Sequence, residues 1–218
     1  MFTGSLLLQH GGAALAVPVV ESSATTLFTT GSPNHVVTMP VGVVSGDLLL
    51  LIVVNGGSFN IATIAGWTKG GGDATPNYIF QWFWKTSDGS EGATVTWTNS
   101  STGAIWAALR ISGQNAAPID TSAITNSAAA SSTTVAAPNI TTSVSNCLLI
   151  QFFSGFTSAT TGTEDNGTTE VIDVNMNSSY NSIVSKKDIA TAGAVGVTTC
   201  TFSSAKTYRG AISISIKP

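Results

Sequence analysis

The chain has 218 residues, of which 43% are hydrophobic and only 9% carry a charge, and its net charge at pH 7 is −3. The apolar content excludes a disordered chain, and the length is sufficient for one sizeable core. The scarcity of charge predicts a surface of Ser, Thr, Asn, Gly and Ala, with neither a basic footprint for nucleic acid nor a basic amphipathic stretch for a membrane.

The first 20 residues predict an N-terminal arm (residues 1–20) instead of a targeting segment. The stretch LLLQHGGAALAVPVV is as apolar as the centre of a signal peptide, but no basic residue precedes Lys69, and Gly11 and Gly12 interrupt the run. Each fully buried Leu or Val contributes roughly 1.5–3 kcal/mol, so a free apolar tail would be costly in water. We expect the arm to lie extended on a neighbouring subunit; the alternative is that it forms the first strand of its own sandwich. Its candidate contact residues are Phe2, Leu6, Leu7 and Leu8.

The rest of the chain predicts β-strands, because no window shows a sustained 3.6-residue apolar period and the apolar runs are short. The strands expected in the first half are residues 25–30, 35–40, 48–54, 78–86, 93–98 and 103–112, with a glycine-rich connector at 55–77. The run LLLLIVV at 48–54 is apolar at every position, whereas a strand with one solvated face alternates. We therefore expect this strand to be covered on both faces, or to lie at the centre of a packed sandwich.

The second half repeats the order of elements of the first. VSNCLLIQFFSG (144–155) aligns with SGDLLLLIVVNGG (45–57), and GVTTCTF (196–202) aligns with GATVTWT (92–98). One such set of strands cannot cover its own apolar face, so we expect the two halves to stack as facing sheets about 10 Å apart. The predicted fold is all-β, a duplicated antiparallel β-sandwich of jelly-roll type that occupies residues 21–218.

The predicted halves cover about residues 35–120 and 134–218, on either side of the polar, low-complexity stretch 121–134. We expect them to form a single unit, because each needs the other as cover. The competing arrangement is two immunoglobulin-like modules joined at 121–134.

Few side chains suit catalysis or metal binding. His10 and His35 have no Cys, Asp or Glu at metal-ligand spacing. There is no G-x-S-x-G elbow, and the glycine-rich KGGGD at 69–73 follows no strand-to-helix pattern typical of a phosphate loop. We therefore expect no enzymatic activity, no metal and no cofactor.

An acidic loop and two cysteines are the remaining chemical candidates. Glu164, Asp165 and Glu170 could supply oxygen ligands for weak calcium binding, but their spacing fits no EF-hand, so we expect a solvated loop. Cys147 and Cys200 could form one disulfide. We expect two buried reduced thiols instead, because nothing in the chain indicates export.

All five tryptophans lie in the first half: Trp67, Trp82, Trp84, Trp97 and Trp106. Tryptophans that face solvent on a sandwich can stack on sugar rings. We expect Trp82, Trp84 and Trp97 to fill the core or a subunit interface. Trp67 lies in a loop and is the one expected to be exposed, which makes it the candidate glycan-binding residue.

Four segments, VVTMPVGVVSGDLLLLIVV, AGWTKGGG, YIFQWFWKTSDGSEGATVTWT and WAALRISGQNAAPID, together resemble a set of phage and prophage virion proteins. The shared pattern is a Gly-Asp that starts an apolar strand, a Gly-Trp-Thr loop, an aromatic strand that ends in an Asp-Gly turn, and a closing strand that ends in Ser-Gly. The resemblance covers about residues 35–120, with the second half as a weaker echo, and residues 1–20 fall outside it. It implies a virion β-sandwich and no activity.

The resemblance implies a tail-associated or a head-decorating component and does not separate the two. We expect decoration or cementing of the capsid exterior, in a virion assembled in the host cytoplasm, because the chain is short, its Ser/Thr surface carries little charge and its arm is apolar. The expected partner is the major capsid protein or another virion protein. We also expect a homo-oligomer, a trimer, at threefold or quasi-threefold positions of the capsid. The alternatives are a tail-fibre or receptor-binding adhesin whose aromatic residues hold a glycan, and a secreted carbohydrate-binding module.

Overall fold

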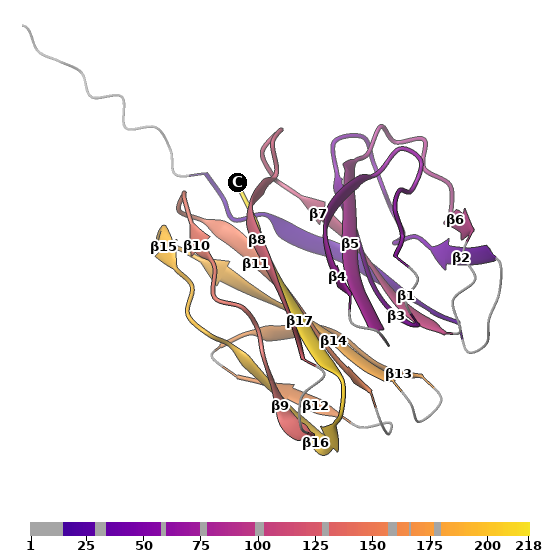
Figure 1. Cartoon of the computed structure of the whole chain (residues 1–218). Helices are drawn as coiled ribbons and strands as arrows, with labels where there is room; N and C mark the ends of the chain where they lie inside the picture. Colours follow the sequence, from indigo (N-terminus) through magenta and orange to yellow (C-terminus); the bar gives the residue numbers. More distant parts are fainter. Residues whose placement is uncertain are drawn as a thin grey trace, which may run out of the picture.

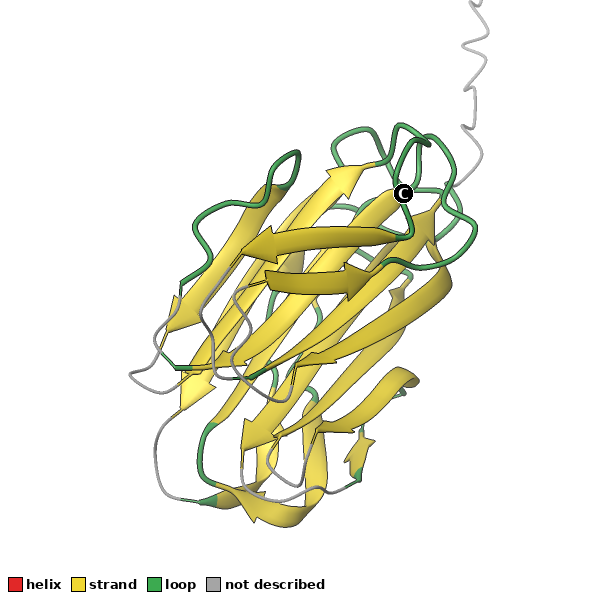
Figure 2. Ribbon diagram, turned by 90° about the vertical axis from the view of Figure 1, so that its right-hand side faces the viewer, coloured by secondary structure: helices red, strands yellow, loops and turns green. Residues whose placement is uncertain are grey.

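Every regular element described in the computed structural model is a β-strand, as Figure 2 shows. The structure describes residues 15–28, 34–57, 60–74, 78–98, 103–127, 131–156, 161–165, 167–176 and 180–218. No helix long and apolar enough to cross a membrane occurs among these residues. The all-β prediction is confirmed, and all strand pairing in the sheets is antiparallel (Figure 1).

The first half of the chain forms one large and one small sheet. Its strands are β1 (Val19–Phe28), β2 (Asn34–Thr38), β3 (Leu48–Gly56), β4 (Thr68–Ala74), β5 (Tyr78–Thr86), β6 (Thr94–Thr98) and β7 (Ala104–Ser112). The first large sheet has the order β1-β7-β3-β5-β4, and the first small sheet is the pair β2-β6. The strand at 48–54 is therefore the central strand of its sheet.

The second half also forms a large and a small sheet. Its strands are β8 (Ile119–Ser127), β9 (Ser132–Ala136), β10 (Thr141–Thr142), β11 (Cys147–Phe156), β12 (Gly162–Glu164), β13 (Thr169–Met176), β14 (Tyr180–Ile189), β15 (Gly193–Ala194), β16 (Thr199–Lys206) and β17 (Arg209–Ile216). The second large sheet has the order β13-β14-β11-β17-β8, the second small sheet has the order β12-β16-β9, and β10 pairs with β15.

The two large sheets share one strand order when β1, β3, β4, β5 and β7 are matched to β8, β11, β13, β14 and β17. Read from β8, the second large sheet runs β8-β17-β11-β14-β13, which matches β1-β7-β3-β5-β4. The contacts between the halves are also symmetric. Strand β4 contacts β8, and their counterparts β13 and β1 contact each other. The sequence predicts the polar stretch 121–134 as a separator between the halves. In the structure most of this stretch forms β8 and the start of β9.

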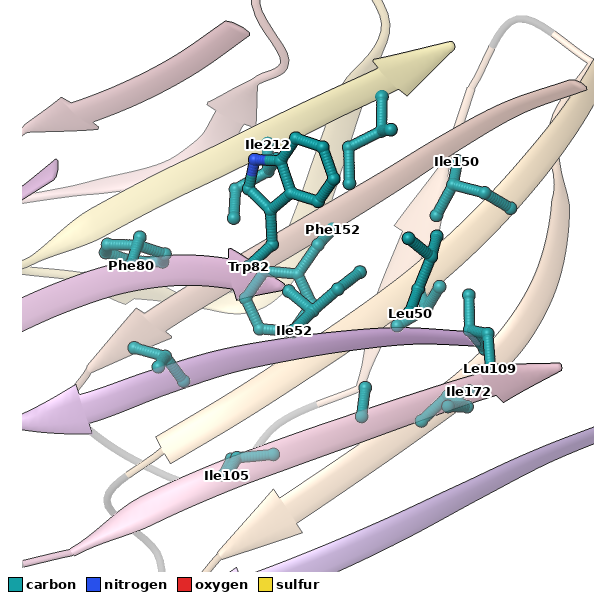
Figure 3. Packing of buried hydrophobic residues seen from close by; sticks show 14 of the residues in the cluster. Leu50, Ile52, Phe80, Trp82, Ile105, Leu109, Ile150, Phe152, Ile172 and Ile212 are labelled. Carbon is teal, nitrogen blue, oxygen red and sulfur yellow. The ribbon is translucent and has the colours of Figure 1, made fainter. Parts of the chain in front are cut away.

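The main core lies between the two large sheets. Figure 3 shows Leu50, Ile52 and Leu109 of the first sheet packed in one cluster with Ile150 and Phe152 of the second. All the labelled side chains of this cluster are buried. The prediction that the halves face each other across a shared apolar interior agrees with this packing.

Each large sheet is also covered on its outer face. On β3, Leu49 and Leu51 point away from the main core and pack with Val37 and Met39, beside the first small sheet. In the second half, Phe153 packs in the same way with residues of the second small sheet: Val135, Cys200 and Phe202. Every residue of β3 is buried for this reason, which confirms that the strand is covered on both faces. The two outer layers themselves were not predicted.

Strand β4 replaces part of the connector predicted at 55–77. A Cβ atom on Gly70 would lie 2.2 Å from the ring of Trp82, and one on Gly71 would lie 3.0 Å from its indole nitrogen. The indole therefore lies directly against the bare backbone of β4. Glycine is depleted in strands, which is why KGGGD does not read as one, but only glycine leaves room for Trp82 here.

An aromatic cluster joins the halves at one end of the sandwich, and it contains all three tyrosines of the chain. The ring of Tyr78 lies 5.1 Å from that of Phe156, 5.8 Å from that of Tyr180 and 5.0 Å from that of Tyr208. Burial, reinforced by the neighbouring Tyr180, raises the pKa of Tyr78 above its ordinary value. Tyr78 comes from the first large sheet and the other three rings from the second half, so the cluster fastens one half to the other.

Candidate interaction surface

The opposite end of the sandwich carries the connecting loops and the chain's C-terminus (Figure 2). We call this surface the loop end. It comprises residues 15–19, 39–47, 87–93, 113–118, 137–146, 190–198 and 217–218. The strand register brings these segments together, because Leu48 pairs with Thr86 and Ile111, and Leu148 pairs with Asp188 and Ile216.

Exposed apolar side chains are concentrated at the loop end. Among the described residues eight large hydrophobic side chains are exposed, and six of these lie there: Leu15, Val19, Val41, Val44, Val144 and Val197. Val41 is 79% exposed and Leu15 is 62% exposed. Single exposed apolar residues are common on proteins, but a concentration of them marks an interaction surface.

Hydrogen bonds hold these loops in place. The carboxylate of Asp47 accepts a hydrogen bond from the backbone N–H of Val44 at 2.8 Å and one from Nε of Arg110 at 2.6 Å. The side chain of Gln114 donates to the carbonyl of Gly46. The β2–β3 loop is thereby tied to β7 and to the loop that follows it, so its valines are presented on a fixed framework.

Leu15, the first described residue, and Lys217, next to the C-terminus, are tied into the same framework. The side-chain amide of Asn146 donates to the carbonyl of Leu15 at 2.9 Å, and the backbone N–H of Asn115 donates to the carbonyl of Lys217 at 3.0 Å. Leu15, Val144, Asn146 and Lys217 line a groove of about 360 Å³ at this point. The described structure therefore begins, at Leu15, in an apolar groove of the loop end.

Val44 and Val144 occupy equivalent turns in the two halves, V-S-G-D-L and V-S-N-C-L. Gly46 and Asn146, two residues further on, both have a positive φ, of 94° and 60°. Asn146 is the only non-glycine residue with a positive φ in the described ranges, and asparagine is one of the residue types that tolerate this conformation. The loop end thus presents one exposed valine from each half on the same kind of turn.

Trp67 lies beside the loop end but is only partly exposed, so its predicted exposure is corrected. Its ring packs against the core cluster outside the first large sheet. It lines a cavity of about 150 Å³ with Met39, Lys85, Glu91 and Val95. The packing holds the ring against its own sheet, and the remaining cavity is smaller than the roughly 300–1,000 Å³ of ordinary small-molecule sites.

An ion pair lies at the rim of this cavity. Nζ of Lys85 is 2.7 Å from Oε1 of Glu91. Burial alone would raise the pKa of Glu91, but hydrogen bonds from Lys85 and Ser87 outweigh it and lower the pKa to about 2. The pair fixes the β5–β6 loop at the loop end across the physiological pH range.

The four arm residues Phe2, Leu6, Leu7 and Leu8 lie outside the described residues, as does His10. Val19 and Val20 were assigned to the arm, but they are the first residues of β1 and pair with Ser112 and Ile111. The boundary between arm and sandwich therefore falls before Val19. Val19 and Val20 therefore belong to the first strand of their own sandwich.

The potentially reactive histidine and cysteine side chains serve structural roles. His35 is buried and stacks on Phe28 with 4.0 Å between the ring centres, and burial lowers its pKa. Cys147 and Cys200 are buried and free, which confirms the prediction of two separate thiols. Burial raises the pKa of both, that of Cys200 to about 12.

Acidic side chains of the loop at 163–170 take part in hydrogen bonds within the protein. The carboxylate of Asp165 accepts hydrogen bonds from the backbone N–H and the hydroxyl of Thr199, while burial raises the pKa of Glu164. Within the described ranges no three His, Cys, Asp or Glu side chains are grouped to hold a metal ion. When the chain is compared with known proteins, no family model, curated protein or solved structure matches it.

Proposed function

We propose that this chain is a non-enzymatic structural protein of a bacteriophage virion that decorates or cements the capsid exterior. The observation that carries the proposal is the loop end, where exposed apolar side chains from both halves stand on hydrogen-bonded loops. The partner is the major capsid protein or another virion protein, and the chain docks on it through this end.

The energetics favour docking through the loop end. Full burial of each Val or Leu contributes roughly 1.5–3 kcal/mol, and the surface presents six such side chains. Loops that are already ordered lose little conformational entropy on binding, which is the main cost that limits affinity. The uncharged segment at 1–14, with Phe2 and the leucines at 6–8, adds apolar surface that requires a cover.

The strand order supports a jelly-roll relationship in each half. In a jelly roll, eight strands form two facing sheets through two Greek keys. Here β1-β7-β3-β5 lies over β2-β6, and β8-β17-β11-β14 lies over β9-β16. The shared order and the shared valine turns support a duplication, in which two jelly-roll-like halves pack through their large sheets. Viral capsid proteins are among the proteins built on jelly rolls.

The roles of the reactive side chains support a non-enzymatic protein. His35 is enclosed by aromatic rings and both thiols are buried within the sheets. Asp47 accepts a hydrogen bond from the backbone N–H of Val44 in its own loop, and Asp165 accepts one from the backbone N–H of Thr199, the first residue of β16. The histidine, thiol and carboxylate groups named here thus stabilise the fold. The exposed valines of the loop end are the groups available to contact a partner.

The homotrimer expected from the low surface charge and from a threefold position on the capsid is part of the proposal. With 9% charged residues, the surface has little charge repulsion to oppose association. A trimer would place three loop ends around a threefold position of the capsid. Light scattering of the isolated protein and of protein released from particles measures this directly, and a monomer in both would contradict it.

Co-sedimentation with particles of the phage that encodes the chain tests the docking surface. Val44→Asp and Val144→Asp should each weaken binding at least about tenfold, which is ~1.4 kcal/mol. Val36→Asp is the matched control, because the exposure of Val36 (46%) lies between those of Val44 (53%) and Val144 (39%), but Val36 is on β2, outside the loop end. Equal binding by all three variants would overturn the proposed surface, and cryo-electron microscopy of the particle would locate the protein.

A further inference from the structure

The two small sheets differ by one strand in the described part of the chain. The first is the pair β2-β6, whereas the second has three strands in the order β12-β16-β9. Equivalent bonds match β2 with β9 and β6 with β16. The backbone N–H of Met39 donates to the carbonyl of Ala93 at 2.9 Å, and that of Ala137 donates to the carbonyl of Thr198 at 2.8 Å. Strand β12 therefore has no described counterpart beside β6 (Figure 1).

The outer edge of β6 presents backbone groups that no described residue binds. Successive residues of an antiparallel strand direct their N–H and C=O groups alternately toward the partner and away from it. The bond to Ala93 and the strand register turn Val95 toward β2, so Thr94 and Thr96 direct their groups away from it. Both threonines are exposed. The strand reads TVTWT, without the charged residues or Pro that commonly protect an open edge from pairing.

The second half shows what kind of chain segment pairs with this edge. The counterparts of the two outward threonines are Thr199 and Thr201 of β16. The carbonyl of Thr199 accepts a hydrogen bond from the N–H of Asp165 at 3.1 Å, and Thr201 pairs with Thr163 of β12. The edge of β6 is therefore built to accept a short antiparallel strand.

A cavity at the loop end adjoins the edge of β6. It is the cavity of about 150 Å³ that Trp67 lines together with Met39, Thr94 and Val95. An apolar cavity of about this volume holds a group the size of benzene. A strand added beside β6 can therefore place one large apolar side chain between Trp67 and Val95.

The segment at residues 1–14 has the composition of such a strand. It contains no Asp, Glu, Lys or Arg, and its run Leu6–Leu8 is as long as β12, which has three residues. Alternate side chains of a strand point to one face, so two of the three leucines can face the cavity. An uncharged, apolar segment matches an edge that is itself uncharged.

The place where this segment meets the described chain favours the β6 of another copy. Leu15 lies in a groove with Val144 and Lys217 and accepts a hydrogen bond from Asn146. These three residues belong to the second half, whereas β6 lies on the outer face of the first large sheet (Figure 1). The segment therefore starts beside the half that does not carry the β6 edge.

We propose that residues 1–14 of one copy add an antiparallel strand to β6 of the next copy, paired with Thr94 and Thr96. Addition of an extended segment to an open sheet edge is a common mode of recognition. The contact is heterologous, so it closes into a ring when the rotation between copies permits, and three copies would give the trimer. Each subunit forms β2-β6 without the added strand, so the exchange stabilises the assembly and not the separate subunit. The exchange does not depend on docking to a capsid.

The test is paramagnetic broadening between two differently labelled copies of the full-length protein. One copy carries a nitroxide at Ser5→Cys, which is selective because both native thiols are buried. The other copy is ¹⁵N-labelled and carries no nitroxide. In the mixture we expect strong broadening of the Thr94 and Thr96 amides. The Thr199 and Thr201 amides are the matched control and should stay sharp, because β12 already pairs with that edge.

Three results would overturn the proposal. The first is no broadening along β6 in a concentrated mixture, and the second is equal broadening along β6 and β16. The third is broadening along β6 only when nitroxide and ¹⁵N are in the same chain, because the segment would then pair with its own sandwich.

Variants test the edge and the segment separately. Thr96→Pro removes the outward N–H and leaves the bonds to β2, and Pro is tolerated at such an edge position. It should weaken association between copies at least about tenfold, and Thr96→Val, which keeps the N–H, should bind more tightly than Thr96→Pro by the same factor. Leu6→Asp combined with Leu8→Asp should give an equal loss without any change to the described fold. Wild-type association in both Thr96→Pro and the leucine variant would show that the copies associate elsewhere.

Discussion

Nε1 of Trp106 donates a hydrogen bond to Nδ1 of His35 across 3.3 Å, between the first large sheet and the first small sheet. Nδ1 can accept this bond only in neutral imidazole, with the proton on the other nitrogen. The ring is also enclosed by Phe28 on one face and by the edge of Trp97. The outer layer is therefore fixed on its sheet by a histidine that must remain uncharged.

Acidification should destabilise the protein through His35. Burial lowers the pKa of His35 below 6.5 in the folded state, so below pH 6.5 the unfolded chain binds the proton more readily. Stability is then complete above pH 6.5 and falls as the pH drops toward the folded pKa, by at most about 1.4 kcal/mol per pH unit. Thermal unfolding at pH 7.5 and pH 5.0 measures the loss.

The control for this effect is His35→Phe, which keeps an aromatic ring beside Phe28 but cannot titrate. The difference in melting temperature between the two pH values should be smaller in this variant than in the wild type. Glu164 and Asp173 have raised pKa values and act in the opposite direction in both proteins. An equal pH response in wild type and variant would exclude His35 as the cause.

Gly70→Ala should destabilise the protein by roughly 1–3 kcal/mol, the usual cost of overpacking a core. The added Cβ would lie 2.2 Å from the ring of Trp82, so the indole or β4 must shift. Gly92→Ala is the matched control, because a Cβ at Gly92 would meet only ordinary contacts of 3.7 Å or more. Urea unfolding of both variants measures the difference, and Trp82→Phe in the Gly70→Ala background should recover part of the loss.

Asp47→Ala should cost about 1–3 kcal/mol, the usual value for loss of hydrogen bonds to a charged group. It removes the acceptor of both the Val44 N–H and the Arg110 guanidinium, and Asp47 is buried. The loss should be measurable by urea unfolding, with a matching increase in hydrogen exchange at Val44. Asp88→Ala, on the exposed β5–β6 turn, removes only the local hydrogen bonds from Ser90. It should cost less stability than Asp47→Ala and leave hydrogen exchange at Val44 unchanged.

Cys147 and Cys200 should resist thiol reagents in the folded protein. Both are buried, and burial raises the pKa of Cys200 to about 12, so the reactive thiolate is scarce at neutral pH. We expect no rapid reaction with an aromatic disulfide reagent under native conditions and reaction of two thiols after denaturation. A mass that is two protons lower in the unreduced protein would reveal a disulfide and contradict the structure.

The sequence predicts the strands whose apolar residues are dense and fails where packing is supplied by a neighbour. The run at 48–54 reads as buried on both faces because every position is apolar. Strand β4 is missed because its glycines are required only by the ring of Trp82, which packs on them from β5. Strand β8 is missed because its Ser, Thr and Ala residues form a sheet edge that needs few large side chains.

The loop end was not predicted from the sequence, for a similar reason. The apolar arm stands out in the sequence, since its apolar residues are contiguous. The valines of the loop end are scattered over more than half of the chain, and only the strand register brings them to one end. The repeated turns V-S-G-D-L and V-S-N-C-L are the signal that could have identified Val44 and Val144 as a pair.

Two N-terminal deletions should separate docking from folding. Removal of residues 1–14 should leave the melting temperature unchanged, because Leu15 and its hydrogen bond to Asn146 remain. Removal of residues 1–18 should lower it, because that bond, the buried Pro18 and the packing of Val17 on the main core are all lost. Both deletions should abolish co-sedimentation with the particle if the arm contributes to docking. A lower melting temperature after removal of residues 1–14 would instead assign the arm to its own sandwich, which is the alternative that the sequence leaves open.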